Sequence, residues 1–320
     1  MDKIINVKEI VARLKEGLKK RVENIKLEAE ITPKLAVILA NDSAASKLYV
    51  KKKSQLCDEL GIEQETYEIG NDVEEEEVLN LIEKLNQDDS VDGILVQMPL
   101  YKHLNVEEVL LAIDPSKDVD ALHPYNIGRC VAGYKVVKPC TAKGVITILD
   151  ELKEPIEGKN VVIVGRSILV GKPLSYMFLE RNATVTVCHS KTVDIGDMTR
   201  KADILVVATG VPSLIKEDMV KQGAIVIDVG INKLANGKIV GDVDIDNVLK
   251  RVRLITPVPG GVGLTTVLSL MQNLVELTEE NYGVKYIPFE QVEEKKTVKQ
   301  KVKDIPKNLK KYVVGKKKNI

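Results

Sequence analysis

The sequence predicts an α/β protein with two domains and a cleft between them. Short apolar runs alternate with amphipathic helical segments along most of the chain, which is typical of parallel sheets covered by helices. A length of 320 residues fits about two domains of ordinary size. A glycine-containing loop at 165–171 joins a buried strand to a helix, as in ligand-binding α/β domains.

Composition argues against several classes of protein. The 47 basic and 47 acidic side chains balance, Trp is absent and aromatic residues are scarce, so we expect no nucleic-acid partner. No apolar run has membrane-spanning length. The cysteines have no C-x-x-C spacing, so neither a zinc site nor a disulfide framework is indicated; they are Cys57, Cys130, Cys140 and Cys188. A cytoplasmic protein without bound metal or membrane is expected.

The first domain is predicted to span residues 1–140. Ser43 and Gly61 are expected to begin and end one of its helices, because a serine caps helix N-termini and a glycine adopts the left-handed conformation at C-termini. The helices are predicted at 7–30, 44–60, 72–86 and 106–113, and the strands at 34–40, 66–69 and 91–97. The segment 114–139 is expected to be irregular, and long loops often carry function.

The second domain, residues 141–264, is predicted to be a Rossmann-type doubly wound parallel sheet. Helices are expected at 141–152 and 173–180, and strands at 161–164, 183–188, 204–207, 225–228 and 254–255. The turns after these strands should line one crevice at the carboxyl edge of the sheet. A helix beginning at 265 is expected to pack back across the first domain, so that residues 265–284 complete it.

The last segment, residues 285–320, has a different composition. It contains twelve lysines and four acids, an excess of eight positive charges. Such a segment is either a solvated extension or a basic arm, and its role and partner stay open. We assign it no catalytic function.

The loop after the strand 161–164 predicts a phosphate site at a helix N-terminus. The chain passes from Gly165 to Gly171, followed by Pro173 in the first helical turn, although the spacing is not G-x-G-x-x-G. An NAD site normally has an acidic residue after the second strand, but this chain has His-Ser-Lys-Thr at 189–192, with Arg166 nearby. These side chains favour NADP, because cations and hydroxyls bind a 2′-phosphate. The alternative is a loop that binds nothing.

The first domain contains a second group of candidates. Tyr49 and Lys53 are four residues apart and share a helix face, where a lysine in a dry cleft would have a lowered pKa. Lys51 and Lys52 support the alternative of a solvated face. Gln97 ends a buried strand and requires a hydrogen-bond partner, either a ligand or Lys53.

Other polar residues allow several readings. The carboxylates of Asp118 and Asp120 could bind a metal, cap a helix or hold the N–H groups of a heterocycle. The three histidines lack metal-ligand spacing and are expected to be structural; they are His103, His123 and His189. The acidic residues 74–77 suit the N-terminal turn of a helix.

Many ordered motifs resemble the bifunctional methylenetetrahydrofolate dehydrogenase and methenyltetrahydrofolate cyclohydrolase family, also called the FolD family. The resemblance covers about the first 280 residues. Its motifs are Ser46-Lys-Leu-Tyr-Val-Lys-Lys-Lys53, Gly93-Ile-Leu-Val-Gln-Met-Pro-Leu100, Lys117-Asp-Val-Asp120, His123-Pro-Tyr-Asn126, Pro139-Cys-Thr141, Val164-Gly-Arg-Ser167, Val170-Gly-Lys-Pro173, Cys188-His-Ser-Lys-Thr192, Ala208-Thr-Gly210, Asp228-Val-Gly-Ile-Asn232, Gly241-Asp-Val-Asp244 and Pro257-Val-Pro-Gly-Gly-Val-Gly263.

The resemblance implies NADP-dependent oxidation of methylenetetrahydrofolate to the methenyl compound, followed by hydrolysis to formyltetrahydrofolate. It implies that Lys53 is the main catalytic group, that Tyr49 stacks on the folate and positions Lys53, that Gln97 tunes the lysine and that Asp120 holds the pterin. The implied cofactor contacts are Gly165, Arg166, Ser167, Ser190 and Ile231, and further substrate contacts are Pro259, Gly260 and Gly261. A homodimer formed through the cofactor domain is also implied.

Three positions depart from the family pattern: Ala142, the pair Ile168-Leu169 and the pair Leu264-Thr265. Two alternatives to the bifunctional enzyme follow from the resemblance. One is a member with a single activity, either an NAD-dependent dehydrogenase or a cyclohydrolase. The other is a folate- or nucleotide-binding protein without turnover that acts through its lysine-rich tail.

Overall fold

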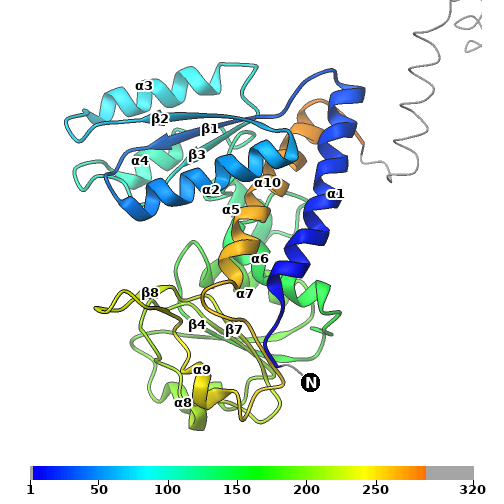
Figure 1. Cartoon of the computed structure of the whole chain (residues 1–320), viewed down its shortest axis with the longest axis vertical. Coiled ribbons are helices and arrows are strands. Elements are labelled where there is room, and N and C mark those ends of the chain that lie inside the picture. Colours follow the sequence, from blue (N-terminus) through cyan, green and yellow to red (C-terminus); the bar gives the residue numbers. More distant parts are fainter. Residues whose placement is uncertain (1–2, 286–320) are drawn as a thin grey trace, which may run out of the picture.

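The structure is a computed structural model that describes residues 3–285. Two parallel sheets form the framework (Figure 1), as the sequence predicts. The first has the strand order β2-β1-β3 and consists of β1 (Lys34–Leu39), β2 (Glu63–Glu68) and β3 (Gly93–Val96). The predicted extension 285–320 lies almost entirely outside the described residues.

The second sheet has the order β10-β7-β6-β4-β5 and is also parallel, which is the doubly wound arrangement expected of a Rossmann-type domain. Its strands are β4 (Asn160–Val164), β5 (Thr184–Cys188), β6 (Ile204–Val207), β7 (Ile225–Asp228) and β10 (Leu254–Ile255). A small antiparallel hairpin, β8 (Asn232–Lys233) and β9 (Ile239–Val240), extends from it. Residues 3–5 pair beside β10, so the chain begins at the second sheet.

The first half has the four predicted helices in the predicted order and one further helix, α5. They are α1 (Val7–Glu28), α2 (Ala44–Leu60), α3 (Glu75–Asn86), α4 (Val106–Leu111) and α5 (Pro124–Val131). The Ser43 side chain accepts from the Ser46 N–H, and Gly61 is left-handed with φ of 75°, so both predicted caps of α2 are confirmed. The expectation of an irregular segment over 114–139 was wrong for residues 124–131, where His123 caps the helix α5.

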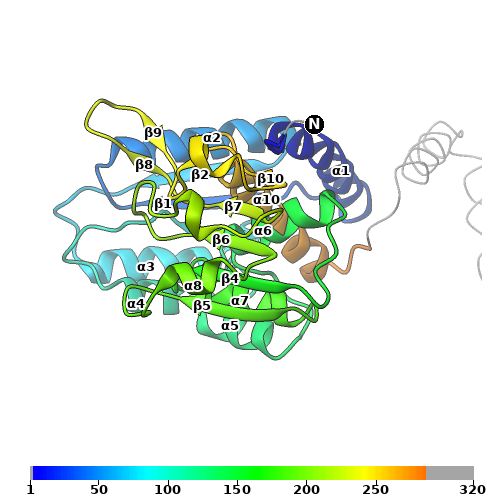
Figure 2. The same ribbon diagram turned by 90° about the horizontal axis from the view of Figure 1, so that it is seen from below.

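Between residues 140 and 285, the structure adds five α-helices and one short 3₁₀ helix. They are α6 (Cys140–Glu151), α7 (Gly171–Leu179), α8 (Ile195–Thr199), α9 (Ile245–Val248), α10 (Val262–Asn281) and the 3₁₀ turn Glu217–Met219. Helix α7 packs on β4 and β5 and also contacts α5 (Figure 2). Helix α10 begins three residues before the predicted position of 265 and directly follows the glycine cluster. Across residues 3–285, no helix combines the length and apolarity needed to cross a bilayer.

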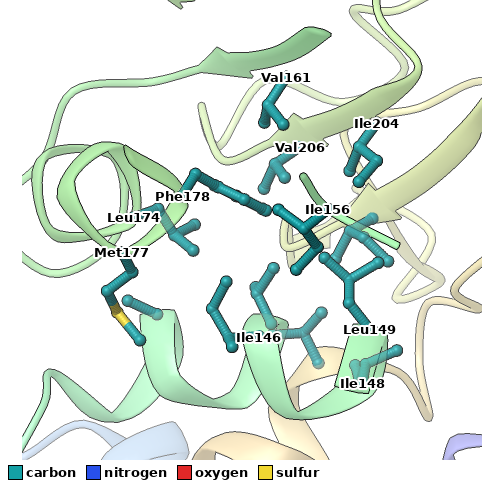
Figure 3. Close-up of a cluster of buried hydrophobic side chains, with 14 of the residues drawn as sticks. Ile146, Ile148, Leu149, Ile156, Val161, Leu174, Met177, Phe178, Ile204 and Val206 are labelled. Carbon is teal, nitrogen blue, oxygen red and sulfur yellow. The ribbon is translucent and has the colours of Figure 1, made fainter. Parts of the chain in front are cut away.

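Apolar cores lie on the sheets. One fills the space between α6, α7 and the sheet of β4 and β6, with Phe178 fully buried at its centre (Figure 3). Another joins β1 and β3 to α1, α2 and α10, including Leu268, Met271 and Leu274. Helix α10 therefore buries one face against the first sheet while it also packs along α6.

Asp92, directly before β3, provides a test of this packing. Burial raises the pKa of its carboxyl to about 6, although the Lys34 N–H that it accepts at 2.8 Å and the Lys117 charge oppose the shift. Between about pH 4 and pH 6 the folded protein therefore binds this proton more tightly than the unfolded chain. The contribution of Asp92 to stability is present at low pH and is lost as the pH rises.

The side chain of Asp92→Asn keeps an acceptor but cannot ionise. We expect the free energy of unfolding of this variant, relative to that of wild type, to be about 1–3 kcal/mol higher at pH 7 than at pH 4. Urea unfolding at the two pH values measures this difference. The exposed Asp89→Asn change is the matched control and should show no such gain. A difference between Asp92→Asn and wild type that is independent of pH would contradict the assignment.

Candidate active site

The first functional side chains project from α2. Tyr49 and Lys53 are one helical turn apart, and the core between β1, α1 and α10 holds the helix through buried residues such as Val50 and Cys57. Both Tyr49 and Lys53 are half-buried and line the same cavity, whereas Lys51 and Lys52 are exposed. The solvated-face reading is therefore wrong for Lys53, although it describes its two neighbours.

Gln97 follows β3 at the carboxyl edge of the first sheet. Its backbone N–H donates to the Ile38 carbonyl at 2.9 Å, and its side-chain Nε2 donates to the Met98 carbonyl at 2.8 Å. The Lys53 Nζ donates to Gln97 Oε1 at 2.7 Å, so Lys53 is the one of the two predicted partners that the structure shows. Asn41 closes the turn by donating to the Gln97 and Pro99 carbonyls.

Asp120 reaches the same cavity from a segment that lies beside β3. The Ile94 N–H donates to the Lys117 carbonyl at 2.7 Å, and Gly93 leaves the space that Val119 occupies, since a Cβ there would lie 2.2 Å from a Val119 methyl. The Asp118 carboxylate accepts from the His123 N–H and from Asn126 Nδ2 at 2.8 and 3.0 Å. Asp118 is thus a structural group, and Asp120 is the carboxylate that lines the cavity.

The charges of this group oppose the effect of burial. Burial lowers the pKa of Lys53, while the nearby Asp120 raises it. Burial raises the pKa of Asp120, while Lys53 and a hydrogen bond from Cys140 lower it. A lysine with a lowered pKa has a larger neutral fraction and can accept a proton.

The cavity around Lys53 has a volume of about 470 Å³ and receives side chains from both halves of the chain. Tyr49, Lys53, Gln97 and Asp120 form its polar side. The apolar side is lined by residues of the second domain and of α10, namely Leu169, Val170, Val229, Ile231, Val262, Val267 and Leu270. The predicted cleft between the domains is therefore present, with a polar side and an apolar side.

A second cavity of about 350 Å³ adjoins the first, and Tyr49, Val229 and Ile231 line both. The predicted contacts Pro259, Gly260 and Gly261 lie here and not beside Lys53. The turns after the strands of the second sheet were expected to line one crevice, and only some of them do. The turns after β7 and β10 line these cavities, but the turn Thr209–Pro212 lines neither.

The predicted phosphate loop joins β4 to α7. Gly165 has φ of 126°, and a Cβ on it would lie 2.2 Å from the Ala208 carbonyl oxygen. A Cβ on Gly171 would lie 2.0 Å from the Gly165 carbonyl oxygen. Both positions therefore require glycine, and the tight turn presents the N-terminus of α7 at the sheet edge, where a phosphate group fits.

Arg166 and Ser190 lie at equivalent positions in the loops that follow two neighbouring strands. Val164 pairs with Cys188 in the parallel register of β4 and β5, so both residues follow that pair by two positions. Arg166, Ser167 and Ser190 are exposed, and no side chain within residues 3–285 pairs with the Arg166 guanidinium. Ser167 Oγ accepts from the Val170 N–H at 3.2 Å. An available guanidinium and two hydroxyls at a helix N-terminus fit a phosphorylated nucleotide.

Several residues of the site had no predicted role. Cys140, Thr141 and Thr266 line the cavity around Lys53, and Asn41 holds the turn after β3. A buried polar residue directly after a strand was the available signal for Asn41. The three histidines, which were expected to be structural, each form a hydrogen bond with the backbone. His103 pairs with the Val73 carbonyl, and His123 and His189 accept from the N–H groups of Tyr125 and Lys191.

Two family models cover most of the chain. Residues 5–120 match the catalytic domain of tetrahydrofolate dehydrogenase/cyclohydrolase, and residues 139–282 match the NAD(P)-binding domain of the same family. The bifunctional FolD protein of Acetivibrio thermocellus is 49% identical over 274 residues, which are 86% of this chain and 96% of the relative. The FolD protein of Methanosarcina barkeri is 49% identical over 280 residues, or 88% and 97% of the two chains.

Solved structures agree with this assignment. The bifunctional FolD enzyme of Campylobacter jejuni superposes with a TM-score of 0.84 at 45% identity and covers 86% of this chain and 98% of its own. The FolD enzyme of Trypanosoma brucei, solved with NADP and an inhibitor, gives a TM-score of 0.83 at 33% identity, with coverage of 87% and 97%. The chain belongs to the tetrahydrofolate dehydrogenase/cyclohydrolase family.

Proposed function

We propose that this protein oxidises 5,10-methylenetetrahydrofolate with NADP and hydrolyses the methenyl product to 10-formyltetrahydrofolate, with both steps in the cleft that contains Lys53. The observation that carries the proposal is the 2.7 Å hydrogen bond from Lys53 Nζ to Gln97 Oε1 in a cavity shared with Tyr49 and Asp120. It gives the hydration step a positioned amine. A binding protein without turnover would not require a lysine with a lowered pKa.

In the hydration step, a water molecule attacks the cationic methenyl carbon and gives its proton to the Lys53 amine. Burial favours the neutral amine, and the positive charge of the bound substrate favours it further. Gln97 Oε1 fixes the direction of Nζ, and Tyr49 supplies an aromatic face for the substrate. The hydroxyl of this intermediate then gives up its proton as the formyl C=O forms. The carbon–nitrogen bond to the pterin ring breaks and that nitrogen takes up a proton, so that one proton is released overall. Asp120 holds the pterin through its N–H groups.

In the oxidation step the cleft has only to align the substrate, because NADP, when bound, supplies the hydride acceptor. The apolar residues Val229 and Ile231 exclude water from the reacting face. The backbone at Gly165 and Ile231 contacts the dinucleotide, and Pro259, Gly260 and Gly261 border the substrate from the second cavity. Arg166, Ser167 and Ser190 bind the 2′-phosphate, which favours NADP over NAD.

The proposal includes the arrangement of the chain. Residues 1–140, completed by the helical segment 265–284, form the folate-binding domain, and residues 141–264 form the NADP-binding domain. The packing of α10 against the core of the first sheet supports this division. Four buried, unpaired cysteines support a reducing, cytoplasmic setting.

A homodimer through the cofactor domain forms another part of the proposal. Strand β5 is the edge of the five-stranded sheet, and Val187 on it is 36% exposed. Tyr176 and Leu179 on α7, which packs against β5, are 38% and 53% exposed. An apolar edge strand beside exposed apolar side chains suits pairing with a second copy.

Lys53→Met should reduce hydration of the methenyl compound by at least about a hundredfold, because the variant has no group that accepts the proton of water. The decay of methenyl absorbance, measured without NADP, tests this. Lys51→Met removes an exposed lysine from the same helix and should leave the rate unchanged. Hydration retained in Lys53→Met would mean that another group activates the water.

Arg166→Gln should lower kcat/KM for NADP by about 10- to 100-fold, the value of a charge-assisted hydrogen bond, and leave kcat/KM for NAD nearly unchanged. Steady-state reduction of each cofactor measures both constants. Lys159→Gln, at the opposite end of β4, is the matched control for loss of a positive charge. Equal losses with the two cofactors would rule out a contact with the 2′-phosphate.

Val187→Lys should convert the dimer to a monomer, because it places a charge on the proposed interface strand. Light scattering coupled to size-exclusion chromatography measures the mass. Val193→Lys changes a residue that is 88% exposed and lies outside the strand, and this variant should stay dimeric. A Val187→Lys protein with the mass of a dimer would place the interface elsewhere.

A further inference from the structure

Two buried carboxylates support the cofactor-side wall of the cleft. Asp228 ends β7, and Asp242 follows β9; they are 3% and 0% exposed. Asp228 lines the second cavity together with Val229, Gly230 and Ile231, whereas Asp242 lines neither cavity. Asp228 is therefore part of the wall, and Asp242 lies one layer behind it.

Asp242 connects three segments of this wall. Its Oδ2 accepts from the Thr209 N–H at 2.6 Å, the Thr209 hydroxyl at 2.9 Å and the Gly210 N–H at 2.9 Å. Its Oδ1 accepts from Asn232 Nδ2 at 2.8 Å. The turn after β6 and the start of β8 are thus fixed to one carboxylate. Charged acceptors make hydrogen bonds about twice as strong as neutral ones.

Asp228 fixes the adjoining segment. Its Oδ1 accepts from the N–H groups of Gly230 and Asp242, and its Oδ2 accepts from the Val243 N–H, all at 3.0 Å. Its own N–H donates to the Thr256 hydroxyl at 2.8 Å, which links the turn to the strand β10 side of the sheet. Burial raises the pKa of Asp228 to about 6, against the effect of the three N–H donors.

Two glycines leave the space that the carboxylates occupy. A Cβ on Gly230 would lie 2.1 Å from Asp242 Oδ1, and a Cβ on Gly241 would lie 1.9 Å from Asp228 Oδ2. Every carboxylate oxygen of the pair has at least one protein donor. The arrangement is therefore saturated by the chain itself, which argues for an internal support and against a cation site.

We propose that Asp228 and Asp242 are positioning residues for the oxidation step, which hold the wall of Val229 and Ile231 at the distance from the substrate that hydride transfer requires. The inference rests on the proposed function. Hydride transfer depends on alignment of two carbons, and a displacement of about 1 Å can cost a hundredfold in rate. Hydration depends instead on Lys53, Gln97 and Asp120, which the first half of the chain supplies. The pair should therefore affect the two steps unequally.

Asp242→Asn is the first variant, because it keeps the shape of the side chain but replaces one acceptor oxygen by a donor. We expect kcat for NADP reduction to fall by about 10- to 100-fold, with hydration of the methenyl compound changed by less than about threefold. Asp242→Ala, which removes all four contacts, should have the larger effect. Asp246→Asn, an exposed carboxylate four residues away, should change neither rate.

Amide hydrogen exchange of the protein without ligands gives a readout independent of activity. In Asp242→Asn, exchange should accelerate about tenfold or more in segments 208–212 and 229–243, and stay unchanged around Lys53. Equal loss of both activities, or unchanged exchange in these segments, would overturn the proposal. If Asp242→Ala does not fold, Asp242→Asn decides alone. Absence of both activities in the wild type would refute the proposed function and leave the exchange test valid.

Discussion

The side-chain amide of Asn273 is the contact on which the geometry of the cleft depends. It is fully buried in α10, and its Nδ2 donates to the Val119 carbonyl at 2.8 Å and to the Lys138 carbonyl at 2.9 Å. These carbonyls lie beside Asp120 and directly before α6. One helix therefore fixes the carboxylate of the active site to the helix that leads into the second domain. Lys143 strengthens the link by donating to Asn273 Oδ1 and to the Glu276 carboxylate.

The charged groups on the two sides of the cleft differ in their exposure to solvent. On the side of the first sheet, burial moves the pKa of Lys53 and that of Asp120 toward the neutral forms, while each charge opposes the shift of the other. On the side of the second sheet, Arg166 stays exposed and unpaired within the described chain, so that its guanidinium is accessible to an anion. A proton-accepting amine needs a dry cavity, and a phosphate site needs an open one. Placing them on different domains allows both.

The sequence predicts those parts of the fold and the site that depend on period and register. The i, i+4 spacing places Tyr49 and Lys53 on one face, and the strand end explains why Gln97 meets Lys53. Parallel pairing likewise brings Arg166 level with Ser190. Asn273 and Asp242 could not be found this way, because most of their partners are far away in the chain and no sequence period relates them. The short helix α5 was missed because its eight residues make only about two turns, too few to separate a helical period from a turn.

The positions that depart from the family pattern fall into two groups, one buried between helices and one at the cavities. Ala142 and Thr265 are fully buried, and Thr265 Oγ1 would lie 2.7 Å from a Cβ on Gly144, so these two residues shape the contact of α6 with α10. Leu169 lines the cavity around Lys53, and Leu264 lines the adjoining one. Both add apolar surface on the side opposite the polar groups. Apolar walls exclude water but bind the substrate and the transition state about equally. These leucines should therefore act on affinity for the folate more than on the hydration step that we propose for Lys53.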